Sequence, residues 1–98
     1  MRAAIAALLL FAVAGCATRA HLRYEANFVA AAPGEFVYVS RTTLDAPDTP
    51  SYEAMRRALI EEAVNERRYC PNGFDVVERK VETSASGRHI HYRGRCRA

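Results

Sequence analysis

Alternation of apolar and polar residues is most regular in the C-terminal quarter of the chain. Phe74–Glu82 and Arg88–Cys96 have the period of strands, and Thr83–Gly87 between them is rich in turn residues. We predict an antiparallel hairpin that sets Glu82 opposite Arg88 and Phe74 opposite Cys96. In that register one face is mostly apolar, and it consists of Phe74, Val76, Ile90, Tyr92, Gly94 and Cys96. The other face is basic and meets solvent, and it consists of Asp75, Arg79, His89, His91, Arg93 and Arg95, with Val77 and Val81 as its only apolar members.

Helical spacing replaces strand alternation in the middle of the chain. Ser51–Tyr69 contains no Gly or Pro, and its apolar residues recur at helical intervals at Tyr52, Met55, Leu59 and Ala63. Thr49 is suited to the N-cap, Pro50 to the first helical position, and Glu53 falls near the first turn. Cys70-Pro71-Asn72-Gly73 should end the helix.

One further strand precedes the helix. Glu35–Thr43 is rich in β-branched and aromatic residues, and Asp45–Pro50 breaks it. Residues 17–33 alternate weakly and end at the turn signal Pro33-Gly34, so we read most of them as a tether. An extra edge strand through Leu22, Tyr24, Ala26 and Phe28 is the alternative. The pattern predicts an α+β fold, β-α-β-β, with one helix packed on a small antiparallel sheet.

The N-terminus has a different character. Met1-Arg2 is followed by an unbroken apolar run from Ala3 to Ala14. A membrane-spanning helix needs roughly 20 apolar residues, so the run is too short to be one. A positive start before a short apolar run is the layout of a secretory signal.

The residues after that run resemble the lipobox of bacterial lipoproteins, with Val13-Ala14-Gly15 before Cys16. The resemblance implies cleavage between Gly15 and Cys16 and lipidation of Cys16. It divides the chain into a signal peptide (1–15), a lipidated tether (16–33) and a folded domain (34–98). Ala17, where Asp would favour inner-membrane retention, implies a periplasm-facing anchor in the outer membrane. Ordinary signal cleavage after Ala12-Val13-Ala14 is the competing interpretation.

The cysteine count bears on that choice. Ordinary cleavage would leave Cys16, Cys70 and Cys96 in an oxidising compartment, with one of them unpaired. Lipidation of Cys16 leaves an even pair, which we expect to form a Cys70–Cys96 disulfide. Closing a loop of about 26 residues contributes roughly 3–4 kcal/mol in the chain-entropy model. A metal site made of Cys70, His89, His91 and Cys96 is the alternative, although strand alternation sends Cys96 to the other face.

Charge and motifs narrow the functional classes. Lys and Arg total 14 and Asp and Glu 11, a net charge of +3, which is too mild to imply nucleic acid. We find no catalytic motif and expect no enzyme, cofactor or resident metal. The basic face is either a solvated surface or a binding face for an anionic envelope component. Its candidate residues are Arg79, His89, His91, Arg93 and Arg95.

Residues 35–96 resemble small uncharacterised envelope lipoproteins of proteobacteria. The resemblance lies in the order of a strand, a long helix, the segment Cys-Pro-x-Gly-Phe and another strand. That resemblance carries no activity over to this chain. Our leading hypothesis is a membrane-anchored, non-enzymatic interaction module. The alternatives are an envelope redox or stress sensor that uses the Cys70–Cys96 bond, and a small-ligand or metal carrier that uses His89 and His91.

Overall fold

In the computed structural model, which describes residues 26–43, 47–85 and 87–98, the C-terminal hairpin is present. Strands β3 (Phe74–Ser84) and β4 (Gly87–Cys96) pair antiparallel, and Phe74 lies opposite Cys96 as expected. The signal peptide and the lipobox fall within residues 1–25 and lie outside the described residues.

The predicted register is wrong beyond the first three pairs of the hairpin. A β-bulge lies between Val76 and Glu78, so that Val77 is an extra residue in β3. Glu82 therefore pairs with His89, not with Arg88, and Arg79 pairs with Tyr92. Because one added residue exchanges the two faces of a strand, Arg79 moves to the face that the prediction had assigned to the core.

The helix α2 (Pro50–Glu66) begins where the sequence indicated. Thr49 is the N-cap and Pro50 occupies the first helical turn, although the Thr49 side chain makes no capping hydrogen bond. The Glu53 N–H donates to the Thr49 carbonyl oxygen at 2.8 Å, which is the first helical bond. Pro50 is favourable there because its nitrogen has no hydrogen to leave unpaired.

The end of α2 comes three residues before the predicted one, at a Schellman motif. The Arg68 N–H donates to the Asn65 carbonyl at 3.1 Å, and the Tyr69 N–H donates to the Val64 carbonyl at 3.1 Å. Arg68 adopts a positive φ of 50°, the conformation that Gly usually supplies. The Tyr69 hydroxyl donates to the Glu35 carbonyl at 2.5 Å, and this bond to the first residue of strand β2 (Glu35–Thr42) holds the turn in place.

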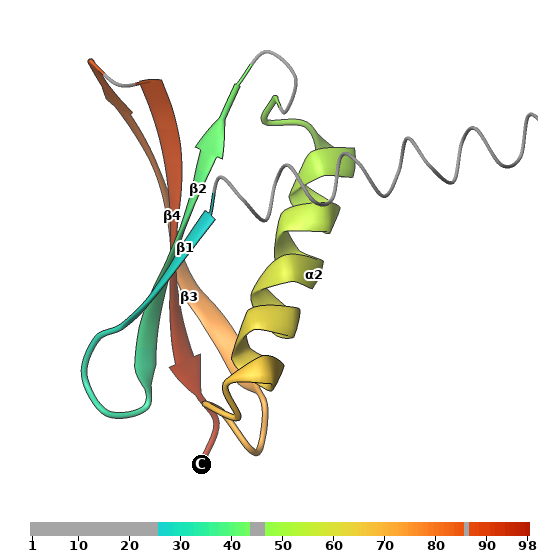
Figure 1. Ribbon diagram of the computed structural model, residues 1–98, viewed down its shortest axis with the longest axis vertical. Helices are drawn as coiled ribbons and strands as arrows, with labels where there is room; N and C mark the ends of the chain where they lie inside the picture. Colours follow the sequence, from blue (N-terminus) through green and yellow to red (C-terminus); the bar gives the residue numbers. More distant parts are fainter. Residues whose placement is uncertain (1–25, 44–46, 86) are drawn as a thin grey trace, which may run out of the picture.

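The remaining strands complete one sheet in the order β1-β2-β4-β3. Strand β2 (Glu35–Thr42) pairs antiparallel with β4, and β1 (Ala26–Ala30) pairs antiparallel with the outer side of β2. The alternative of an extra edge strand is therefore confirmed for Ala26–Ala30. Figure 1 shows α2 on one side of the sheet and the opposite side uncovered by the described residues. The fold is α+β, one helix on an antiparallel sheet, as the pattern predicted.

The core lies between α2 and the two central strands. Its buried apolar residues are Phe36, Tyr38, Leu59, Ile60, Val64, Cys70, Ile90 and Tyr92. Of the predicted helical stripe, Leu59 is buried, while Tyr52, Met55 and Ala63 pack partly buried around the core. The Phe36 ring lies directly over Gly94, its partner across the two strands, because no Cβ occupies that space.

Candidate functional site

The uncovered side of the sheet, which we call the open face, is where the sequence predicted either a solvated basic surface or a binding face for an anionic component. In β4, Ile90 and Tyr92 are buried under α2, so His89, His91, Arg93 and Arg95 lie on the other side. The structure thus brings four of the five predicted residues together. The open face of the four strands comprises Asn27, Val29, Glu35, Val37, Val39, Arg41, Asp75, Glu78, Lys80, Glu82, His89, His91, Arg93 and Arg95.

Carboxylates alternate with the basic side chains on the open face. Arg93 Nη2 lies 3.1 Å from Glu78 Oε2, and Arg95 Nη2 lies 3.2 Å from Glu35 Oε1. His91 Nε2 lies 3.3 Å from Glu82 Oε2, across β3 and β4. The bulge at Val77 causes this arrangement, because it turns Glu78 and Glu82 toward the open face.

The open face is therefore balanced in charge and is not the basic surface that the sequence predicted. Its bases are Arg41, Lys80, Arg93 and Arg95, and its acids are Glu35, Asp75, Glu78 and Glu82, four of each with His neutral. The Lys80 ammonium, which hydrogen-bonds Glu82, holds the pKa of that carboxyl below its ordinary range, and His91 adds to the effect. Arg97, directly after β4, ion-pairs with Asp75 at 2.7 Å, so an anion approaching the face meets carboxylates that are paired with most of its basic groups.

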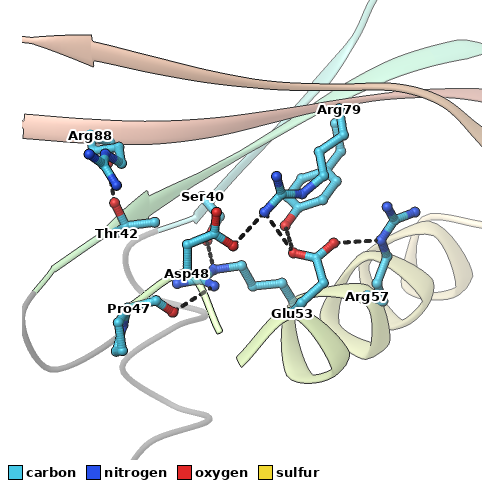
Figure 2. Close-up of polar contacts among 10 residues, drawn as sticks. Ser40, Thr42, Pro47, Asp48, Glu53, Arg57, Arg79 and Arg88 are labelled. Atoms are coloured by element: carbon cyan, nitrogen blue, oxygen red, sulfur yellow. Dashed lines mark hydrogen bonds and ion pairs between the residues drawn. The ribbon is translucent and has the colours of Figure 1, made fainter. Parts of the chain in front are cut away.

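Arg79, the fifth predicted residue, lies on the opposite side of the sheet near the start of α2 (Figure 2). Its guanidinium donates to Asp48 Oδ1 at 2.5 Å and to Glu53 Oε2 at 3.3 Å. The Tyr92 hydroxyl donates to Glu53 Oε2 at 2.6 Å, and Arg57 Nε donates to Glu53 Oε1 at 2.9 Å. This cluster ties the first turn of the helix to β3 and β4.

The electrostatics of the cluster suit an anchor. Partial burial alone would raise the pKa of Glu53, but hydrogen bonds from Tyr92, Arg57 and Arg79 outweigh it and hold that pKa below its ordinary value of 4.5. Burial, and next the Glu53 carboxylate, raise the pKa of Tyr92 well above its ordinary value of 10.0. A carboxylate that accepts from three donors is stabilised as the anion, so we assign Glu53 a structural role.

Arg56 is a second polar contact between helix and sheet, and the sequence did not predict it. Its side chain is fully buried; Nε donates to Ser40 Oγ at 3.2 Å, and Nη1 donates to the Pro47 carbonyl at 3.2 Å. Helical periodicity could have predicted this burial. Arg56 lies four residues after Tyr52 and four before Ile60, on the side of the helix that packs on the sheet.

The predicted disulfide is confirmed. Cys70 and Cys96 are bonded, with their Cα atoms 5.0 Å apart and a separation of 26 positions in sequence. The bond joins the segment after α2 to the last residue of β4. The alternative metal set is not assembled, because the cysteines bind each other while His89 and His91 lie on the open face. Among the described residues, no three His, Cys, Asp or Glu side chains converge to hold a metal ion.

A shallow groove of about 170 Å³ runs between β1 and α2. Its floor is apolar, formed by Ala26, Phe28, Tyr38, Leu59 and Ala63. Three charged residues of the helix and its C-cap, Glu62, Glu66 and Arg67, stand at its rim. The groove therefore follows the outer edge of the sheet.

Comparison with known proteins returned no matching family model, no matching curated protein and no matching solved structure. In the described part of the chain, α2 is too short and too polar to cross a membrane.

Proposed function

We propose that this chain is a bacterial envelope lipoprotein, anchored through lipid on Cys16, whose small α+β domain is a non-catalytic interaction module. The observation that carries the proposal is the pairing of the cysteines. With Cys70 and Cys96 in a disulfide, Cys16 remains, and it stands directly after Val13-Ala14-Gly15 and the apolar run. A disulfide in so small a domain is typical of an exported protein.

The open face is our proposed contact surface. Alternating acids and bases beside Val29, Val37 and Val39 complement a protein surface with both charge signs better than a polyanion such as a phosphate-rich lipid. The residues that we propose to contact the partner are His89, His91, Arg93 and Arg95. Ala17 after the lipidated cysteine supports an outer-membrane location.

The structure offers more support for a structural disulfide than for a redox sensor. Cys70 is only 6% exposed, and Cys96 is partly buried against the core. Labile, regulatory disulfides are usually exposed or strained, because an attacking thiolate must reach a sulfur.

Fractionation of Cys16→Ser tests the anchor. We expect the full chain to partition with membranes, and the variant to leave unprocessed precursor or soluble protein. A double variant, Cys70→Ser with Cys96→Ser, is the matched control, because it loses cysteines but keeps the lipobox and should still be processed. Globomycin, which inhibits lipoprotein signal peptidase, should cause precursor to accumulate. Normal processing and membrane association of Cys16→Ser would refute the proposal.

A further inference from the structure

Strand β1 forms one edge of the sheet, and three of its five residues direct their backbone groups away from the sheet. The Ala31 N–H donates to the Glu35 carbonyl at 3.0 Å, which identifies that pair as hydrogen-bonded. Antiparallel pairs alternate, so Val29 and Asn27 direct their N–H and C=O groups toward β2. Ala26, Phe28 and Ala30 direct theirs outward, where no described strand pairs with them.

The two edges of the sheet differ in their protection. The free edge of β3 carries a bulge at Val77 and a run of charged residues, Glu78, Arg79, Lys80 and Glu82. Charges and bulges are the devices by which natural sheets prevent pairing at their edges. The sequence of β1, Ala-Asn-Phe-Val-Ala, contains no charge and no proline, and its register with β2 has no bulge.

The outward groups of β1 are also symmetric about Phe28. A second β1, antiparallel and related by a two-fold axis through Phe28, sets Phe28 opposite itself and Ala26 opposite Ala30. All three resulting pairs present outward groups on both strands, so each can exchange two hydrogen bonds. We propose that two copies of this chain associate through their β1 edges about this axis, forming one continuous eight-stranded sheet.

Side chains on both faces of β1 would be buried further by this contact. Phe28 lies on the helix side, where it borders the apolar groove, and the second copy's Phe28 would cover the groove. On the open face Val29 is 47% exposed and would lie opposite Asn27 of the second copy. Both signs of charge stand at the rim of each groove, on Glu62, Glu66 and Arg67, so acids of one copy can approach the base of the other. A closed two-fold interface leaves only the protected β3 edges free.

Photo-crosslinking in cells tests the interface with the full chain. A photoreactive amino acid replaces Val29 in one strain and Val77 in another. These two valines are a matched pair, since each is 47% exposed and each lies on an edge strand. We expect position 29 to give a covalent dimer containing two differently tagged copies, and position 77 to give none.

The variant Ala30→Pro provides a second, independent test of the interface. It removes an outward N–H and leaves the hydrogen bonds between β1 and β2 in place, so the circular dichroism and the disulfide should be unchanged. A dimer would lose two hydrogen bonds, one per copy, and at about 1 kcal/mol each the dissociation constant should rise about thirtyfold in detergent sedimentation. The proposal would be overturned by the absence of a position-29 homodimer, by an adduct with a different protein there, or by association that Ala30→Pro leaves unchanged.

Discussion

Gly94→Ala should destabilise this protein severely although alanine is usually the better strand residue. Gly in a strand interior costs about 0.5–1 kcal/mol relative to Ala, so propensity alone predicts a gain. A Cβ on Gly94 would lie 2.1 Å from Phe36 Cζ and 2.4 and 2.7 Å from its two Cε atoms. Carbon atoms pack at about 3.5–4.0 Å, so the ring must move by more than about 1 Å.

The neighbours of Phe36 prevent that movement. Its ring is fully buried, stacked on Phe28 at 5.2 Å between centroids and edge-on to Phe74 at 5.4 Å and Tyr69 at 6.1 Å. Overpacking a core costs about 1–3 kcal/mol, and expelling a Phe side chain from one costs about 3–5 kcal/mol. We therefore expect Gly94→Ala to lower the free energy of unfolding by about 3 kcal/mol, which corresponds to a melting temperature roughly 12–24 °C lower.

Urea and thermal unfolding of the mature protein, followed by far-UV circular dichroism, measures the effect. Gly34→Ala is the matched control, since Gly34 also has a special role, with φ of 76°, but no atom within 4 Å of the added Cβ. Gly34→Ala should lower the free energy of unfolding only by the cost of placing alanine in a left-handed backbone conformation, about 1–2 kcal/mol. Phe36→Leu in the Gly94→Ala background should restore part of the loss, through a coupling energy of about 1 kcal/mol or more. A Gly94→Ala protein as stable as the Gly34→Ala control, or no rescue by Phe36→Leu, would contradict the reasoning.

Four further predictions concern the Cys70–Cys96 disulfide, the polar cluster and the open face. Replacing both cysteines of the Cys70 disulfide with Ser should cost about 3–4 kcal/mol in urea unfolding, from the 26-residue separation. Glu53→Gln should cost about 2 kcal/mol at neutral pH, and because the pKa of Glu53 is lowered on folding, the gap from wild type should close as the pH falls below about 4.5. The pKa of Tyr92 is raised on folding, so its effect on stability has the opposite pH dependence. Tyr92 stabilises the fold fully below pH 10, and this stabilisation is lost as the pH rises further. Tyr92→Phe should therefore reduce the loss of stability at alkaline pH. Arg93→Gln with Arg95→Gln should change stability by less than about 1 kcal/mol, since both ion pairs are exposed, and a large drop in melting temperature would refute the assignment of the open face.

The sequence was sufficient for the features that depend on composition and local periodicity. The order strand, helix, hairpin and the Cys70–Cys96 bond follow from turn residues, helical spacing and the number of cysteines. The helix start at Pro50 follows because its signal is local. The helix end was misplaced by three residues because Arg68, not Gly, adopts the left-handed conformation there, and a tertiary hydrogen bond from Tyr69 stabilises it.

The faces of β3 depended on information that lies elsewhere in the chain. Val77 is β-branched and suits a regular strand, so nothing local marks it as the bulge. With a regular strand, Arg79 would lie opposite His91 on the open face, and Glu53 would lose one of its three donors. With the bulge, Arg79 reaches Asp48 and Glu53 beside the Tyr92 ring, where its guanidinium lies 5.9 Å from the ring centroid.

The bulge and the polar cluster therefore explain each other, and together they determine the character of the open face. Turning Arg79 inward necessarily turns Glu78 and Glu82 outward, because neighbours in a strand alternate. Those two carboxylates neutralise the basic residues of β4 that looked like an anion-binding surface in the sequence. A contact made near the first turn of α2 thus determines the charge of the far side of the sheet, which is the contact surface that we propose. The search for a partner should begin with protein surfaces of mixed charge, and with a second copy at β1.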